Sequence, residues 1–331
     1  MTTKDKVIHG KMNLSAGQLT AVTACFLWST TGLTAAIGTQ AGRALWLCWL
    51  LALVAVAPVY MQFPRFVLNN ERKKWVSFVY PIYAVLASAV CLSAIIYVWE
   101  EWTMTQAPFA IYAALLALLV GYAAARGTVA AMRLSVLLAA SLLVLALFDT
   151  LLLLPQMELH RIILPIYSSA GKILPTTLLL LLLLLLPLPS LVFVTRRSRE
   201  EGLPMAQIQR SLRHGFLWGS FYLLLSAVRN VLALGDLLIF DHYPLLRALK
   251  MTELGIGLSR LEYFGMMALL AVVASAAMLQ LSLATDCLCE RKAIPSRKRL
   301  ALVLCLLLLV SMLIFTAYGT AVDFSGKAVA L

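Results

Sequence analysis

Small hydroxyl residues gather in the middle of the first long apolar run of this sequence. Ser29, Thr30, Thr31 and Thr34 surround Gly32. Glycine weakens a helix, and the hydroxyls supply hydrogen-bond donors and acceptors. An unwound stretch here would expose backbone groups and helix ends, which suit the carboxylate and ammonium of an amino acid. Thr30, Thr31, Gly32 and Thr34 are therefore candidate ligand-binding residues; the alternative is a close helix–helix contact through small residues.

A second interruption falls in the sixth apolar run, where Pro187 and Pro189 flank Leu188 and precede Ser190. Two prolines remove two backbone donors and disfavour helical geometry in the residues before them. A simple kink, or a helix that ends early, is the alternative. If the chain consists of two inverted halves of five helices, runs one and six are equivalent. Interruptions at corresponding positions of two halves indicate a binding site, here with Leu188, Pro189 and Ser190 as ligand-binding candidates.

Charged residues inside or beside the apolar runs are the candidates for an ion or signal pathway. Arg229 lies within the seventh run, and Asp236 follows seven residues later on the same helical face. Glu262 opens the eighth run, and Asp149 lies near the end of the fifth. A charge at membrane depth usually faces the interior with a partner. Snorkelling of Arg229 to the membrane surface, or a purely structural ion pair, are the alternatives.

Further polar residues can face a cavity between the helices. Ser93 and Tyr97 in the third run are the ligand-binding candidates of this kind, with Ser88 beside them and Ser275 in the eighth run. Each of them alone is more typical of a hydrogen bond between two helices.

The sequence contains no nucleophile–base constellation and no glycine-rich phosphate loop. The six cysteines and four histidines are scattered, without the spacing of a metal site or a disulfide framework. We therefore expect no enzymatic activity, no cofactor and no metal. The net charge is +12, but the basic residues lie in loops, so membrane orientation explains them better than nucleic-acid binding does.

Long apolar runs must position these residues. Hydrophobic residues make up 62% of the 331 and charged ones 13%, and the mean hydropathy is +0.91. A bilayer core needs ~20 apolar residues per helix. The sequence predicts an all-α polytopic membrane protein, embedded in a lipid bilayer as one transmembrane domain over residues 1–331. About nine spans of this length are predicted near 17–38, 43–62, 76–98, 108–124, 131–154, 172–194, 214–236, 261–285 and 299–320.

The loops predict the orientation. With the N-terminus in the cytoplasm, most of the 27 lysines and arginines fall on the cytoplasmic side. This is the bias that cytoplasmic loops show. Residues 1–13 then form a cytoplasmic tail.

Several short motifs resemble those of endospore germination permeases, the B subunits of nutrient-germinant receptors. One is Leu14-Ser15-Ala16-Gly17-Gln18-Leu19 before the glycine-interrupted helix, and a second is Gln40-Ala41-Gly42-Arg43-Ala44-Leu45-Trp46-Leu47. The others are Tyr122-Ala123-Ala124-Ala125-Arg126-Gly127 with Arg133, and Tyr243-Pro244 followed by Leu258-Ser259-Arg260-Leu261-Glu262. The resemblance covers all nine predicted spans, and its motifs are loose.

The resemblance implies a LeuT-like inverted-repeat bundle of the amino acid–polyamine–organocation superfamily. A small germinant such as an amino acid would bind at the unwound middles of helices one and six. The partners would be an A-type membrane subunit and a C-type lipoprotein subunit, and the location a bacterial cell membrane or the spore inner membrane.

The chain departs from the family in span number, since members usually have ten spans. Two other functions stay open: a cation-coupled amino-acid transporter of the same superfamily, and a degenerate scaffold subunit that only supports assembly. The apolar character of the sixth run predicts a small apolar ligand such as alanine or valine.

Overall fold

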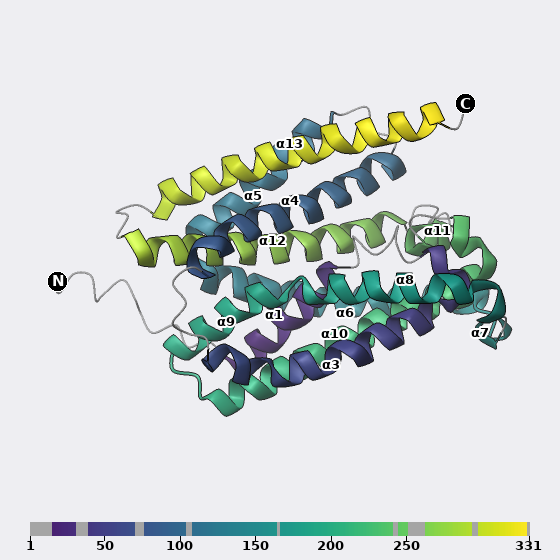
Figure 1. Cartoon of the computed structure of the whole chain (residues 1–331), viewed down its shortest axis with the longest axis horizontal. Coiled ribbons are helices and arrows are strands. Elements are labelled where there is room, and N and C mark those ends of the chain that lie inside the picture. Colours follow the sequence, from purple (N-terminus) through teal and green to yellow (C-terminus); the bar gives the residue numbers. More distant parts are fainter. Residues whose placement is uncertain are drawn as a thin grey trace.

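The computed structural model describes residues 15–30, 39–69, 76–103, 108–163, 166–240, 244–250, 262–292 and 297–329. Within these ranges every regular element is a helix. The long helices lie side by side along one direction (Figure 1). They are α1 (Ala16–Ser29), α3 (Leu45–Asn69), α4 (Val76–Thr103), α5 (Phe109–Arg126), α6 (Thr128–Leu153), α8 (Ile166–Leu185), α9 (Leu188–Glu200), α10 (Met205–Leu234), α12 (Glu262–Lys292) and α13 (Arg297–Val329).

Short helical pieces connect the long helices at one end of the bundle. They are η1 (Thr39–Ala44), η2 (Leu154–Gln156), α7 (His160–Ile163), η3 (Gly235–Phe240) and α11 (Pro244–Lys250). The start of α1 is fixed by a capping box, in which the Gln18 amide N–H donates to the Ser15 hydroxyl at 3.2 Å and the Ser15 N–H donates to the Gln18 side chain at 3.1 Å.

Eight of the helical segments are long and apolar enough to cross a membrane. Helices suit this environment because all their backbone hydrogen bonds close within the segment. The prediction of an all-α polytopic membrane protein is confirmed. Helices α8 and α9 together form one such segment, Gly171–Glu200. The first predicted span, 17–38, is described as helix only to Ser29, and residues 31–38 lie outside the described residues.

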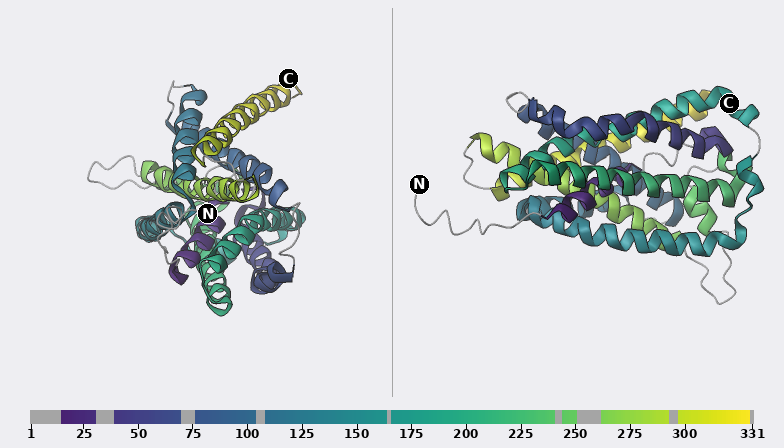
Figure 2. Two further views of the ribbon diagram at one scale, coloured as in Figure 1. Left: turned by 90° about the vertical axis from the view of Figure 1, so that its left-hand side faces the viewer. Right: turned by 90° about the horizontal axis from the view of Figure 1, so that it is seen from below.

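Helix α12 lies at the centre of the bundle (Figure 2, left). It packs against α1, α4, α5, α6 and α13. Small and apolar residues from Val272 to Ala284 bury nearly all of its surface, which lets neighbouring helices approach from several directions.

The packing of the helices repeats within the chain. Helix α1 packs against α10, and α8 packs against α3; α12 packs against α5, and α4 packs against α13. The pairs α3 with α10, α4 with α12 and α5 with α13 are also in contact. When α1 is exchanged with α8–α9, α3 with α10, α4 with α12 and α5 with α13, each of these contacts becomes a contact of the same set. The contact of α1 with α10, for example, becomes that of α8 with α3. Successive spans cross in opposite directions, so this exchange relates halves of opposite orientation, as in inverted repeats.

Helix α6 has no counterpart in this exchange among the described helices. It packs against α12, α1 and α5. In the right-hand view of Figure 2 it runs along the lower edge of the bundle, while α3 runs along the upper edge.

Two glycines of α10 allow α1 to pack closely against it. A Cβ atom at Gly215 would lie 2.6 Å from the Thr20 carbonyl oxygen, and one at Gly219 would lie 2.5 Å from Leu27 Cδ1. The spacing of four residues is that of a small-residue helix contact in membranes. The contact fixes α1, and with it the buried end of that helix, against α10.

We predict that Gly215→Ala destabilises the protein, because the added methyl group meets a backbone oxygen that cannot move aside. Overpacking of this kind costs about 1–3 kcal/mol. The thermal unfolding temperature of the purified protein in detergent measures the effect. Gly171→Ala in α8 is the matched control, since a Cβ there meets nothing within 4 Å. Equal stability of both variants would contradict the close α1–α10 contact.

Candidate ligand site and buried charge pair

Helix α1 ends inside the protein. Thr30, which follows its last residue, is 1% exposed. The Ser29 hydroxyl donates to the Phe26 carbonyl at 2.8 Å, and the Thr30 hydroxyl donates to the Leu27 carbonyl at 2.6 Å. The Thr30 backbone N–H also donates to the Leu27 carbonyl at 3.2 Å, and the carbonyls of this last turn carry the negative end of the helix dipole. The buried end of α1 therefore offers partial negative charge, while Thr31, Gly32 and Thr34 lie outside the described residues.

The proline pair interrupts the sixth span only briefly. Leu186 and Pro187 separate α8 from α9, and Pro187 keeps right-handed helical angles of φ −70° and ψ −16°. Leu188, Pro189 and Ser190 form the first turn of α9. The prediction of an unwound stretch at these three residues is therefore corrected to a kink, because proline at the start of a helix already has the required φ.

Two tyrosines bind the carbonyls that the kink leaves without helical partners. The Tyr60 hydroxyl of α3 donates to the Leu184 carbonyl at 2.8 Å. The Tyr83 hydroxyl of α4 donates to the Leu186 carbonyl. A buried carbonyl without a donor is costly, and water does not reach the hydrocarbon core to supply one. The kink is thus tied to helices on both of its sides.

A small polar region lies next to the kink. The Ser190 hydroxyl lies beside that of Tyr80 on α4, and the Tyr80 ring packs on Phe193 with centroids 4.0 Å apart. Within the described residues neither hydroxyl makes a hydrogen bond of normal geometry, and the same holds for Ser93 on α4. All three residues are less than 5% exposed. Buried polar atoms of this kind usually have a partner, such as a water molecule or a ligand.

The predicted ligand-binding residues only partly come together. Helix α9, which carries Ser190, contacts both α1 and α4. Tyr97 is half-buried, and its ring packs on Phe109 of α5 at 5.6 Å. Ser88 donates to the Gln280 side chain at 2.7 Å, and Ser275 donates to the Val272 carbonyl of its own helix at 2.8 Å. The hydrogen bond between two helices that was the alternative for such residues is thus confirmed for Ser88, whereas Ser275 bonds within its own helix.

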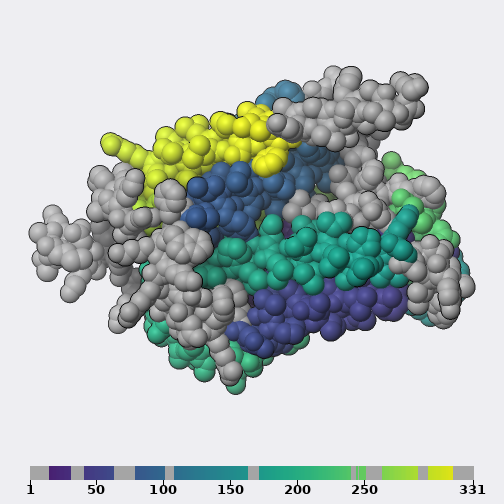
Figure 3. Space-filling model, in the orientation of Figure 1, coloured from purple at the N-terminus to yellow at the C-terminus, as the bar shows by residue number. Residues whose placement is uncertain are grey.

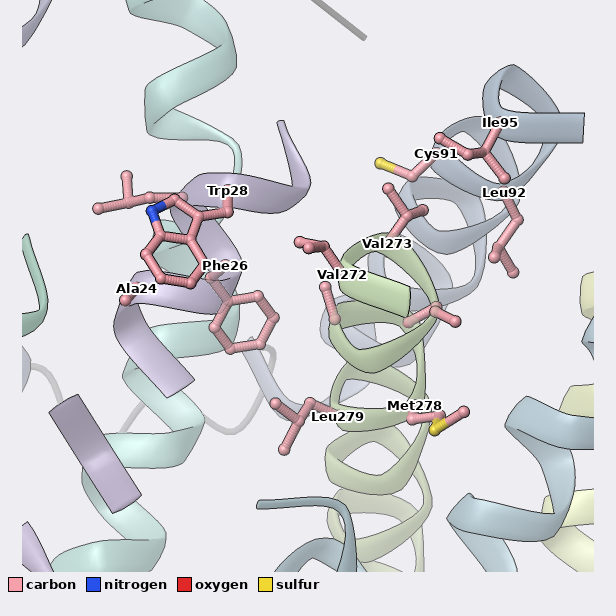
Figure 4. Close-up of a cluster of buried hydrophobic side chains, with 14 of the residues drawn as sticks. Ala24, Phe26, Trp28, Cys91, Leu92, Ile95, Val272, Val273, Met278 and Leu279 are labelled. Atoms are coloured by element: carbon pink, nitrogen blue, oxygen red, sulfur yellow. The ribbon is translucent and has the colours of Figure 1, made fainter. Parts of the chain in front are cut away.

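Apolar side chains line the space between α1 and α12. Phe26 projects from α1 toward Val272 and Leu279 of α12, while the Trp28 ring turns away from α12 and packs on Tyr222 of α10 (Figure 4). Phe26, Trp28, Val272 and Leu279 belong to one buried hydrophobic cluster. The surroundings of the α1 end are therefore apolar except for its own backbone and hydroxyl groups.

Arg229 does not snorkel to the surface, because it is only 2% exposed. Its guanidinium donates to the Ser226 hydroxyl at 3.3 Å and to the Thr150 hydroxyl at 3.5 Å. Asp149 on α6 is 5% exposed and interacts electrostatically with Arg229. No ion pair within 4.0 Å joins the two in this described part of the chain. They form a buried pair of oppositely charged side chains that interact without direct ion-pair contact.

Asp236, which we predicted on the same face as Arg229, lies elsewhere. Its side chain is 70% exposed and pairs with Arg43 of η1. Arg229 therefore has Asp149 as its acidic neighbour. Glu262 begins α12, and its side chain lies outside the described residues.

A small pocket adjoins the charge pair. Asp149, Tyr222 and Gly265 are among its lining residues, and its volume is about 10 Å³. That volume holds roughly one water molecule. Tyr222 also packs against Trp28, with ring centroids 4.9 Å apart. Trp28 precedes Thr30 by two residues, so the end of α1 and the charge pair are connected through these two rings.

Sequence reasoning missed the tyrosines at the kink and the arginine that caps α10. Arg161 donates to the Leu232 carbonyl at 3.2 Å and to that of Ala233. A tyrosine in an apolar run is a usable signal, since its hydroxyl needs a partner when buried. The Arg161 contact joins residues 71 apart in sequence, and no local pattern indicates it.

No protein-family model matches the sequence, and no curated protein matches it. The site is therefore interpreted from its own geometry and chemistry.

We predict that Tyr60→Phe and Tyr83→Phe each destabilise the protein by about 1–3 kcal/mol, because each leaves a buried carbonyl without its donor. Thermal unfolding in detergent measures this. The control is Tyr122→Phe, which removes an exposed hydroxyl that accepts from Arg126 at 2.9 Å. It should change stability by less than about 0.5 kcal/mol. Indistinguishable losses in all three variants would contradict the role of the two tyrosines at the kink.

We predict that Arg229→Gln and Asp149→Asn have non-additive effects on stability. Each single change leaves the opposite charge buried without compensation, whereas the double change removes both charges. A double-mutant cycle on thermal unfolding should give a coupling energy of about 0.5–3 kcal/mol. Strict additivity would show that the two charges do not interact.

Proposed function

We propose that this chain is a permease-like membrane subunit that binds a small nutrient, an amino acid, between the buried end of α1 and the kink of α8–α9. We further propose that it is the B-type subunit of a spore germinant receptor with LeuT-like architecture. It would lie in a bacterial cell membrane or spore inner membrane with its N-terminus in the cytoplasm. An A-type membrane subunit and a C-type lipoprotein would be its partners.

One observation carries this proposal. Helix α1 and the α8–α9 pair exchange with each other in the repeated packing, and both are interrupted inside the bundle. Helices α1 and α9 are also in contact. Discontinuous helices at corresponding positions of two inverted halves are typical of the binding sites of secondary transporters.

The chemistry of the two interruptions suits an amino acid with a small side chain. The carbonyl end of α1 attracts an ammonium group. The hydroxyls of Ser190 and Tyr80 are available to a carboxylate, which accepts hydrogen bonds. Phe26 and Val272 offer apolar walls (Figure 4). Alanine or valine fits these walls better than a charged side chain, because burying a further charge is costly.

Signal transmission would use the two rings beside α1. A ligand at the end of α1 shifts Trp28, and Trp28 packs on Tyr222 next to the Asp149–Arg229 pair. A buried charge pair that is not in direct contact can change its separation with the helix arrangement. A change in the distance between Asp149 on α6 and Arg229 on α10 would favour one of two arrangements of these helices over the other.

The buried charge pair also favours a second candidate function, a cation-coupled amino-acid transporter. Ionisable residues inside a membrane commonly mark ion or proton pathways. Uptake of labelled alanine into proteoliposomes that contain only this protein distinguishes the two functions. Accumulation driven by an ion gradient supports the transporter, whereas binding without uptake supports the receptor subunit.

We predict that alanine or valine raises the thermal unfolding temperature of the purified protein. A ligand at a hundred times its dissociation constant stabilises by about 2.7 kcal/mol. Ser190→Ala and Thr30→Val should weaken the effect, since each removes one hydroxyl, with an expected loss of about 1–3 kcal/mol of binding free energy.

Ser141→Ala is the matched control, because the Ser141 hydroxyl is exposed on α6 and donates to the Leu138 carbonyl of its own helix at 2.9 Å. It should leave the shift unchanged. Stabilisation by no amino acid in a full panel, or shifts that ignore Ser190 and Thr30, would contradict the proposed site.

A further inference from the structure

The carboxyl group of Asp149 has no direct partner among the described residues. It is 5% exposed, yet no described group donates a hydrogen bond to it, and no described cationic side chain lies within 4.0 Å. Its interaction with Arg229 acts over a longer distance. An ionised carboxylate that is buried without a partner is costly, so such a group takes up a proton instead. The surroundings of Asp149 therefore suit a carboxyl that binds a proton.

Arg229 is held by groups other than this carboxyl. Its guanidinium donates to the hydroxyls of Thr150 on α6 and Ser226 on α10, and its Nε–H makes no hydrogen bond to a described residue. An arginine keeps its positive charge inside a protein. The guanidinium therefore has a donor left for a carboxylate, and Asp149 is the carboxyl group that acts on it electrostatically.

The pocket beside Asp149 suits a proton better than a metal cation. Its volume of about 10 Å³ holds roughly one water molecule. Among its lining residues only Asp149 and Tyr222 carry a side-chain oxygen, and the others are apolar or glycine. Cations such as Ca²⁺ and Mg²⁺ take about six or more oxygen ligands, which these walls do not supply. A water molecule that enters the pocket can deliver a proton to the carboxyl.

Asp149 lies near one end of its membrane-crossing segment. It precedes Gln156, the last residue of that segment, by about two helical turns. Helix α6 is on the side of the bundle away from α13, α4, α8 and α3 (Figure 2, right), which form the surface in Figure 3. A proton therefore has a short way to Asp149 from the end of α6, without passing the kink of α8–α9.

Arg229 and Tyr222 of α10 are the titratable groups that face Asp149. The other helices in contact with α6 carry titratable groups that have partners or surroundings elsewhere. Cys25 of α1 donates to the Ser135 carbonyl, Tyr112 of α5 packs on Trp99, Arg126 bonds with Tyr122, Tyr263 of α12 packs beside Leu246 and Met266, Asp286 pairs with Arg297, and Arg247 and Lys250 of α11 are exposed.

We propose that Asp149 is a proton-binding site at which a proton and the Arg229 guanidinium compete for one carboxylate. With the proton bound, the carboxyl is neutral and Arg229 stays on the hydroxyls of Thr150 and Ser226. When the proton leaves to water in the pocket, the carboxylate attracts the guanidinium and draws α6 toward α10. The two forms are thus two arrangements of one pair of helices.

The site itself is inferred from the packing of α6, α10 and α12. Its use rests on the proposed function: in the receptor subunit it is a switch beside Tyr222, and in the transporter the proton is the coupling ion. The test below contains no amino acid, so its outcome does not depend on whether the chain binds one.

Infrared spectroscopy of the protein in lipid vesicles, recorded over a range of pH, tests the proposal. At a pH of about 6 exposed aspartates and glutamates are ionised. We expect the carbonyl band of a protonated carboxyl to remain at this pH in the wild type and in Asp236→Asn, whose carboxylate is 70% exposed, and to be lost in Asp149→Asn. Asp149→Glu should keep a band at a shifted frequency, which separates loss of the site from misfolding.

The competition with Arg229 is tested by the pH at which the band disappears. Arg229→Gln removes the charge that favours the carboxylate, so the band should persist to a pH about 1–3 units higher. Arg43→Gln is the matched control, since Arg43 pairs with Asp236 instead, and it should leave the midpoint unchanged. A wild type without the band at pH about 6, a band that survives in Asp149→Asn, or an unmoved midpoint in Arg229→Gln would each overturn the proposal.

Discussion

The absence of water from the bilayer core governs this structure. Backbone groups there must be satisfied by the protein itself, so a helix can be interrupted only where side chains replace the lost hydrogen bonds. The chain meets this condition twice. Ser29 and Thr30 bind carbonyls in the last turn of α1, and Tyr60 and Tyr83 bind the Leu184 and Leu186 carbonyls at the kink between α8 and α9. Both interruptions are thereby held inside the bundle, next to helices that carry buried hydroxyls for which the described residues supply no hydrogen-bond partner.

The same packing places the interruptions in relation to each other. Gly215 and Gly219 bring α1 onto α10, while α8 packs on α3, and these two contacts exchange in the repeated arrangement. From the end of α1, Trp28 reaches Tyr222 and the neighbourhood of Arg229 and Asp149. A small molecule bound at the interruptions would therefore act on a bundle whose second polar region is one ring contact away. This arrangement favours a ligand-responsive subunit.

Membrane spans were the most predictable part of the fold, because ~20 apolar residues between charged turns have few alternatives. The local effect of Pro187–Leu188–Pro189 was predicted only as an interruption; whether it unwinds or kinks depends on donors such as Tyr60, which lies 124 residues away. Which of the two acids named beside Arg229 lies next to it, Asp149 or Asp236, could not be predicted from the sequence for a related reason. Helical periodicity places Asp236 on its face, but the chain leaves α10 as η3 before that residue, and Asp149 arrives from α6.

The most direct test of the central claim is hydrogen–deuterium exchange of the reconstituted protein with and without alanine or valine. Interrupted helices exchange faster than continuous ones, because their local opening is easier. The account predicts that the ligand slows exchange in the peptides around residues 26–30 and 184–191, and leaves α5 and α13 unchanged. Protection confined to other helices, with none at the two interruptions, would contradict a binding site between α1 and the kink of α8–α9.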